Sequence, residues 1–207
     1  YVTGSSAATW GSPLQAFAGG SDAYVAKLSS SGSLTWSTFL GGAGNDTGAD
    51  IAVDSSGNVY IAGDSSANWG SPLRAYTSGS DAFAAKLTSS GSLSWNTFLG
   101  GSGSEYGTGI TVDTSGNVYL SGYGDATWGA PARAYSGGFD GFAVKLSSSG
   151  GLTWNTFLGG SGYDIAKDIA VDSSGNVYVA GMSGSSWGSP VQSYGGGSYD
   201  QFAAKVS

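Results

Sequence analysis

Hydrophobic and polar positions alternate along short stretches of this chain with the two-residue period of a β-strand. In residues 81–87 (DAFAAKL), Phe83, Ala85 and Leu87 fall on one face, and two alanines and Lys86 fall on the other. No stretch carries the apolar stripe with a period of 3.6 residues that marks an amphipathic helix. The pattern therefore predicts an all-β protein.

Three further strands are predicted close to this one. Residues 51–54 (IAVD) and 58–63 (NVYIAG) flank a Gly-Asn turn, which predicts a tight hairpin. Residues 93–99 (LSWNTFL) form the last strand, and its alternation places Leu93, Trp95 and Leu99 on one face. In chain order we name these four strand types A, B, C and D. A polar loop separates B from C, and a Gly-rich crossing leads from D to the next A.

The four-strand pattern repeats every 59 residues. When residues 1–59 are aligned with residues 60–118, 37 of the 59 positions are identical. The repeats cover residues 1–59, 60–118 and 119–177, with a partial unit at 178–207, and together they make one domain. A four-stranded unit of this length is typical of a propeller blade. We therefore expect a β-propeller-like fold of about 3.5 repeats, with four blades of which the terminal ones are incomplete.

The repeated motifs are LGG at 40–42, IAVD at 51–54, GNVY at 57–60 and DAFAAKL at 81–87. A unit of this kind resembles the SBBP family, the bacterial and archaeal beta-propeller repeat. The departures are small: Glu105 replaces an Asp in one crossing, and Ala84 replaces a Val. The resemblance implies a propeller-like fold on secreted or surface proteins, and it implies neither an enzyme activity nor an agreed ligand.

The strand types follow the order BCD, ABCD, ABCD, ABC, which makes 14 strands where four complete blades need 16. Three arrangements stay open: a closed four-bladed disc with two three-stranded blades, completion by another copy in a ring or filament, and a fragment of a longer array. The start at Tyr1 without Met suggests a processed product or an excised piece. Unpaired strand edges invite pairing with other chains, so Tyr1, Val2 and Val206 are candidate self-assembly residues.

Two sets of tryptophans recur with the repeat, and each has two interpretations. The first set follows the B strands in Trp-Gly-Ser/Ala-Pro loops, where it could stack on glycans or hold its own loop onto the blade. The second set lies on the D strands, where it could dock another copy or belong to the core between blades. The loop set is Trp10, Trp69, Trp128 and Trp187, and the D-strand set is Trp36, Trp95 and Trp154.

Carboxylates also recur, and their spacing suits either Ca²⁺ or turn capping. Asp46, Asp50 and Asp54 gather near the first crossing, and the third unit repeats this spacing. The second unit has Gly109 at the middle position, so a shared Ca²⁺ site would lose a ligand there. We therefore expect turn caps and no metal or other cofactor. Asn45 begins the N-glycosylation sequon of the chain.

Composition narrows the function further. The chain has no Cys and no His, which removes disulfides, thiolate and imidazole metal ligands, and His-based catalytic triads. The charged residues recur with the repeat, whereas an active site needs a unique set, so we expect no enzyme. A net charge of −7 with 7 Lys and Arg argues against a nucleic-acid partner. No apolar run is long enough to span a membrane.

Together these observations predict a non-catalytic extracellular or cell-surface structural protein. It would assemble with other copies of itself, as a filament or oligomer, through its incomplete terminal blades. The alternative is a glycan- or surface-binding module that uses the Trp loops.

Overall fold

The computed structural model describes residues 1–206, which form fourteen strands and no helix. The strands build four antiparallel sheets, which we name S1 to S4 in chain order. S1 contains β1 (Val2–Ser6), β2 (Asp22–Leu28) and β3 (Leu34–Leu40), and S2 contains β4 (Asp46–Val53), β5 (Val59–Ser65), β6 (Asp81–Leu87) and β7 (Leu93–Leu99). S3 contains β8 (Glu105–Val112), β9 (Val118–Gly124), β10 (Asp140–Leu146) and β11 (Leu152–Leu158), and S4 contains β12 (Asp164–Val171), β13 (Val177–Ser183) and β14 (Asp200–Val206).

Within every sheet the strands lie side by side in chain order. S1 therefore holds the types B, C and D, S2 and S3 hold all four types, and S4 holds A, B and C. The predicted all-β class, the 14 strands and their order are confirmed. The inner edge of S1 is β1, and the outer edge of S4 is β14.

Two details of the strands differ from the prediction. β4 begins at Asp46, earlier than residue 51, because the Gly-rich crossing already pairs with β5 around a register shift between Gly48 and Asp50. Leu93 does not share a face with Trp95. The pairing of β6 with β7 shifts register beside Lys86, so Leu93 packs toward S1 while Trp95 packs toward S3.

The hairpin between A and B strands is closed by an Asp. Asp54 Oδ1 accepts the backbone N–H groups of Ser56 and Asn58, and its Oδ2 accepts the Asn58 side chain and the Tyr60 hydroxyl at 2.8 and 3.0 Å. Gly57 has a φ of 79°, which a residue with a side chain rarely adopts. Asp113 and Asp172 repeat the arrangement, so the turn-capping interpretation of these carboxylates is confirmed.

Each sheet has two unlike faces, and unlike faces meet at each junction. In S2, Ile61, Phe83 and Leu87 form a bulky face that packs on S1. The opposite face carries Tyr60 and Ala84 with further alanines, and this small face packs on the bulky face of S3. The same arrangement joins S3 to S4. Because bulky side chains fill the space above small ones, neighbouring sheets can approach closely without voids.

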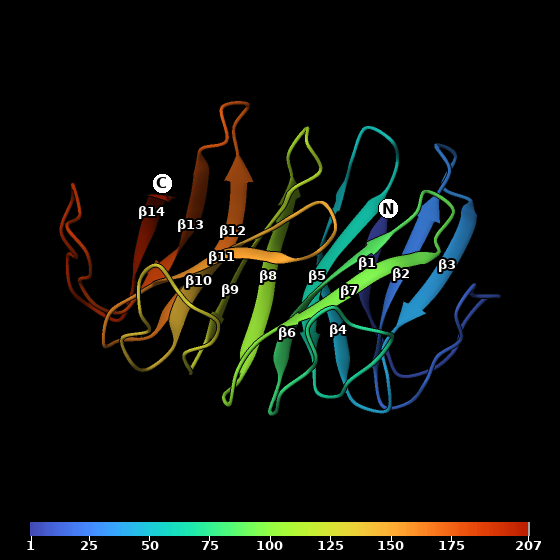
Figure 1. Cartoon of the computed structure of the whole chain (residues 1–207), viewed down its shortest axis with the longest axis horizontal. Helices are drawn as coiled ribbons and strands as arrows, with labels where there is room; N and C mark the ends of the chain where they lie inside the picture. Colours follow the sequence, from blue (N-terminus) through green and yellow to red (C-terminus); the bar gives the residue numbers. More distant parts are fainter. Residues whose placement is uncertain (207) are drawn as a thin grey trace.

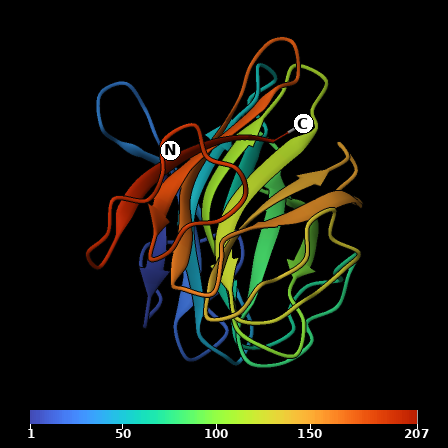
Figure 2. The ribbon, with the colours of Figure 1, turned by 90° about the vertical axis from the view of Figure 1, so that its left-hand side faces the viewer.

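The four sheets form an open row. S1 and S4 lie at opposite ends of the long axis (Figure 1), and the view from the C-terminal end shows S4 in front of the other sheets (Figure 2). The closed four-bladed disc considered from the sequence is therefore wrong. Each sheet packs on the next through one face, so the four sheets make an open arc (Figure 1), and the outer faces of S1 and S4 have no sheet against them within residues 1–206.

Candidate functional site

The outer face of S1 is a bulky face without a partner sheet in the chain. Leu28 is 42% exposed, whereas Leu87, its counterpart in S2, is fully buried. Val2 is likewise 42% exposed, whereas its counterpart Ile61 is fully buried. Leu34 is also exposed, and Trp10 and Tyr24 help to line a hollow of about 590 Å³ on this face. We call this surface the bulky end face and define it by the following residues: Val2, Trp10, Tyr24, Ala26, Leu28 and Leu34.

The outer face of S4 is a small face without a partner sheet. Tyr178 is 43% exposed, whereas Tyr60 and Tyr119 at the same place in S2 and S3 are 0% and 1% exposed. Ala180 and Ala203 are exposed, although their counterparts in S2 are buried. We call this surface the small end face and define it by the following residues: Tyr178, Ala180, Gln201, Ala203 and Lys205.

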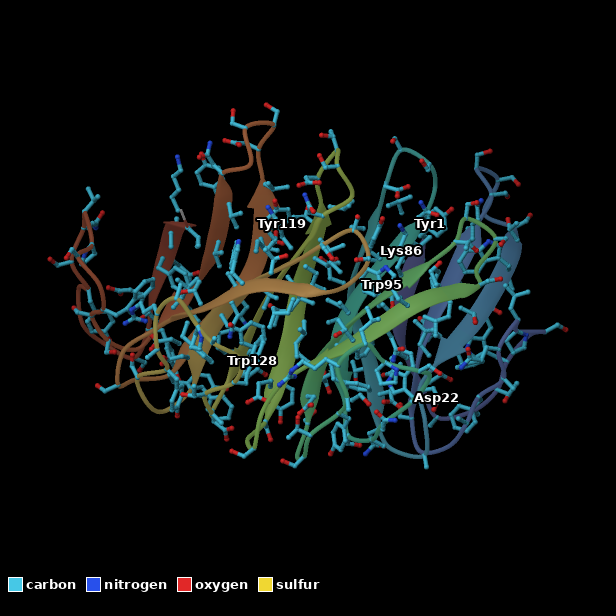
Figure 3. The ribbon with its side chains drawn as sticks, in the orientation of Figure 1. Tyr1, Asp22, Lys86, Trp95, Tyr119 and Trp128 are labelled. Atoms are coloured by element: carbon cyan, nitrogen blue, oxygen red, sulfur yellow. The ribbon has the colours of Figure 1, made fainter. Side chains whose placement is uncertain are left out.

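A row of three side chains, a Tyr, a Lys and a Trp, crosses the small face of S1, S2 and S3. In S2, the Lys86 ammonium lies 5.1 Å from the centre of the Tyr60 ring, and Lys86 pairs with Trp95 on the next strand (Figure 3). A cation above an aromatic ring is stabilised by the ring quadrupole. In S4, Lys205 lies 5.8 Å from the Tyr178 ring, but no D strand brings a Trp to the end of the row within residues 1–206.

The D strand of an inner sheet is held from both sides. β7 pairs with β6 on one side, and the loop between β5 and β6 covers its other side. Leu73 N donates to Asn96 O at 2.9 Å, Phe98 N donates to Arg74 O at 3.1 Å, and Asn96 Nδ2 donates to Trp69 O at 3.0 Å. S3 repeats all three bonds around β11. The loop and the C strand therefore form a clamp around each D strand.

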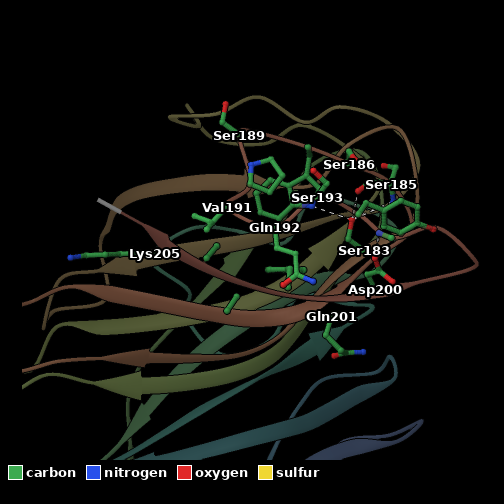
Figure 4. A pocket seen from close by; sticks show the side chains of 18 residues that line it. Ser183, Ser185, Ser186, Ser189, Val191, Gln192, Ser193, Asp200, Gln201 and Lys205 are labelled. Carbon is green, nitrogen blue, oxygen red and sulfur yellow. Dashed lines mark hydrogen bonds between the residues drawn. The ribbon is translucent and has the colours of Figure 1, made fainter.

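S4 keeps both sides of this clamp with a groove between them. The groove has a volume of about 990 Å³ and lies between β14 and the loop of residues 185–195. Figure 4 shows the loop with Val191 and Gln192 on one side and the strand with Gln201 and Lys205 on the other. Val191 is fully exposed. Val191 and Gln192, the counterparts of the loop residues whose backbone binds the D strand in S2, thus line an open groove.

The Trp loops do not present sugar-stacking surfaces in the inner sheets. Trp69 and Trp128 are only 4% and 3% exposed. Each ring packs edge to face on the phenylalanines of its own sheet, and the Trp69 ring centre lies 5.2 Å from that of Phe83. Trp10 and Trp187 in the end sheets are half-buried. The loop-anchoring interpretation therefore describes Trp69 and Trp128, and the predicted ligand contact at these two residues is wrong because their faces are covered.

The D-strand tryptophans join neighbouring sheets within the chain. Trp36 Nε1 donates to Ser89 O at 3.3 Å, and its ring lies against Gly91 in the turn of the next sheet. Trp95 lies against Gly150 in the same way. The core interpretation describes both, so these two residues are not free for docking another copy. Trp154 is half-buried beside Tyr119 and has no such turn beside it within residues 1–206.

The candidate assembly residues at the chain ends have different surroundings. Tyr1 is 37% exposed and contacts Trp36 edge to face, and Val2 belongs to the bulky end face. Val206 is half-buried and packs toward S3, so only its position on the outer edge of S4 fits the prediction. Asn45 is exposed, and its glycosylation stays a prediction.

Pairs of buried acids lie at the three sheet junctions, a feature that the sequence analysis missed. They are Asp22 with Asp46, Asp81 with Glu105, and Asp140 with Asp164, and all six residues are fully buried. Each pair converges on a glycine: a Cβ atom at Gly41 would lie 2.5 Å from Asp46 Oδ2 and 3.0 Å from Asp22 Oδ1. The glycine therefore leaves the space that the two carboxyl groups occupy.

The burial of these pairs changes their ionisation. Burial raises the pKa of Glu105 to about 7, and the nearby Asp81 adds to the effect. Burial raises the pKa of Asp140 to about 6, with a contribution from Asp164. Two like charges close together disfavour the doubly ionised form. At the second junction, the positive charge of Arg74 partly offsets the rise in the pKa of Asp81. The counterpart of Arg74 at the first junction is the uncharged Gln15.

Each of the acids considered as a Ca²⁺ ligand accepts hydrogen bonds from a different set of backbone groups. Asp46 Oδ2 accepts the Gly42 N–H, Asp50 accepts those of Ile51 and Ile110, and Asp54 caps its turn. Among residues 1–206, no three acidic side chains lie together in a metal-binding cluster.

The comparisons with known proteins agree with this geometry. The SBBP family, described as a beta-propeller repeat, matches residues 35–68, 95–127 and 153–186. Each match runs from a D strand through the A and B strands of the next sheet, so the family's unit spans a sheet junction. No curated protein matches the sequence. In the part of the chain that the structure describes, no helix has the length and apolar character needed to cross a bilayer.

Proposed function

Since three stretches of the chain match the SBBP beta-propeller repeat, we propose that the protein is a non-catalytic structural module that assembles end to end with further copies of itself. The bulky end face of one copy packs on the small end face of the next. One observation carries this proposal: the two end faces are the two halves of an interface that the chain makes three times internally.

The polarity of the assembly follows from the same observation. At each internal junction a bulky face meets a small face, so the matching contact between copies is head to tail. Such a contact is heterologous, and it makes a ring if the rotation closes and an open filament if it does not. Burial of Leu28 and Val2 against Tyr178 and Ala203 would remove the exposed apolar surface that distinguishes the end sheets from the inner ones.

Two further features support a structural role. The turn-capping acids and the Lys–Tyr rows recur in each repeat and are engaged in holding strands and turns together. The low content of charged residues and the family suit an extracellular or cell-surface location, which fractionation of the source cells would test. Glycan binding has less support because the faces of Trp69 and Trp128 are covered.

The test is the assembly state, measured by sedimentation velocity over a range of concentrations with negative-stain microscopy. The wild-type chain should form oligomers or filaments as its concentration rises. Leu28→Asp and Ala203→Asp should each give monomers, because each places a charge in one end face. Ser55→Asp, at an exposed turn, is the control for added charge and should assemble normally.

Mixing the two monomeric variants tests the polarity. Each variant retains one intact end face, so an equal mixture should form dimers and nothing larger. A mixture that stays monomeric would exclude head-to-tail packing, and a wild-type chain that stays monomeric at high concentration would exclude the assembly itself.

A further inference from the structure

We propose that the groove in S4 is an acceptor site for an extended segment with the pattern Leu-x-Trp-Asn-Thr-Phe-Leu, presented by a partner polypeptide. The segment would add as a fourth strand beside β14. The groove shares Gln201, Ala203 and Lys205 with the small end face, but it lies at the strand edge between β14 and the loop of residues 185–195, whereas the end faces are sheet surfaces.

The backbone on both sides of the groove matches the clamp of the inner sheets. In S2, the N–H of Leu73 binds a D-strand carbonyl and the carbonyl of Arg74 accepts a D-strand N–H. Their counterparts here are Val191 and Gln192, which lie in the open loop. On the other side, the edge of β14 presents the unpaired backbone groups that an added strand needs.

The side chains that line the groove specify the occupant. In S2, the Phe98 ring packs edge to face on Trp69 and Tyr76, with ring centres 5.9 and 5.8 Å apart. Trp187 and Tyr194 are the counterparts of these two rings and line the groove. A Phe in the added segment would therefore pack on them.

Two more positions of the segment follow by the same reasoning. In both inner sheets an Asn side chain of the D strand donates to the carbonyl of the loop Trp, at 3.0 Å in S2 and 2.9 Å in S3. An Asn in the segment would bind the Trp187 carbonyl. The Trp directly before the Asn in the segment would lie opposite Lys205, as Trp95 lies opposite Lys86.

The experiment uses the whole chain and a labelled peptide with the sequence of residues 151–160 (GLTWNTFLGG). Fluorescence anisotropy should show saturable one-to-one binding. A peptide with the Phe157→Ala change should bind at least about tenfold more weakly, since an aromatic anchor dominates such interfaces. A peptide of the same composition in scrambled order should not bind.

Val191→Pro tests the strand geometry. It removes the N–H that corresponds to the Leu73 donor, and it loses no packing because Val191 is fully exposed. We expect affinity to fall roughly 3- to 10-fold, as for one lost hydrogen bond. Val191→Ala keeps the N–H and should bind normally.

Hydrogen exchange provides a readout that separates strand addition from nonspecific adhesion. Amides of β14 should become protected when the wild-type chain binds the peptide. Trp187→Ala should weaken binding, whereas Trp10→Ala, at the same place in S1, should not.

The proposal is overturned if the peptide fails to bind at millimolar concentration, if Val191→Pro binds as well as Val191→Ala, or if β14 gains no protection. Because assembly is measured without peptide, either proposal can fail alone.

Discussion

The inner and terminal sheets have nearly the same sequence but different environments. Tyr60 and Tyr119 are buried and Tyr178 is 43% exposed, although all three occupy the same place in the repeat. Leu87 is buried and Leu28 is 42% exposed for the same reason. A side chain in this fold is thus buried by the next repeat as much as by its own, as in other repeat proteins, where each unit contacts only its neighbours.

The largest expected effect comes from substituting the leucine at the same position of the repeat in an inner sheet and in a terminal sheet. Leu87→Ala should lower the free energy of unfolding by about 2–5 kcal/mol, because it leaves a cavity at the junction of S1 and S2. Leu28→Ala should cost about 1 kcal/mol or less in dilute solution, since the side chain is partly hydrated already. Urea unfolding measures both values.

Repeating the measurement at several protein concentrations makes the comparison of Leu28→Ala with Leu87→Ala more informative. If copies pack through the bulky end face, the cost of Leu28→Ala should grow as concentration rises, while that of Leu87→Ala should stay constant. Equal costs for the two substitutions in dilute solution would contradict the difference between inner and terminal sheets.

The junction acids predict a smaller effect that depends on pH. The pKa of Glu105 is raised to about 7 in the folded chain, from an ordinary value of 4.5, so folding favours the protonated acid. This contribution is complete below the ordinary pKa and is lost as pH rises through 7. Glu105→Gln should therefore stabilise the chain at pH 8 by roughly 1–2 kcal/mol, after allowance for solvent screening, and remove part of the pH slope. Thermal unfolding at several pH values measures this.

Asp54 gives the opposite sign and serves as the control. Burial acts to raise the pKa of this carboxyl, but hydrogen bonds from Asn58, Tyr60 and Ser56 outweigh it and lower the pKa. Its contribution is present above pH 3.8 and is lost in acid. Asp54→Asn should destabilise the chain at pH 7 and have little effect well below pH 3. The same pH slope for both variants would exclude the account of the junction acids.

The smallest predicted effect compares the first junction with the second. Arg74 donates to Phe98 O at 3.0 Å and to Gly100 O at 2.5 Å beside Asp81 and Glu105. Gln15 has this place beside Asp22 and Asp46. Gln15→Arg should raise the free energy of unfolding by about 0.5–1.5 kcal/mol. Gln15→Lys should gain less because it lacks the planar fork. No gain from Arg, or an equal gain from Lys, would argue against this arrangement.

Much of the fold was predictable because its signals are local. Two-residue alternation identified strand β6, and its two faces are those expected. The 59-residue period placed the same strands in each unit. The error at Leu93 came from a register shift beside Lys86, which depends on pairing with a neighbouring strand and leaves no local signal in the sequence.

The candidate sites were harder to predict because they depend on neighbours far apart in the chain. From the sequence alone, Trp69 is a possible ligand contact. The structure shows that its ring packs on Phe83 and Phe98, which lie elsewhere in the chain. The junction acids belong to different repeats, so their convergence on Gly41 is invisible in either repeat alone. One signal for the groove was available: the loop of residues 185–195 repeats the sequence of the loops that hold a D strand in S2 and S3.

The sequence by itself determined the strands, their order and the two unlike faces of each sheet, because these follow from alternation, turn residues and repetition along a single stretch of chain. Only the tertiary structure decided that the four sheets form an open arc, which faces stay uncovered and which acids meet. Those outcomes depend on how one sheet packs on the next, and that packing is set by the shapes of two surfaces together.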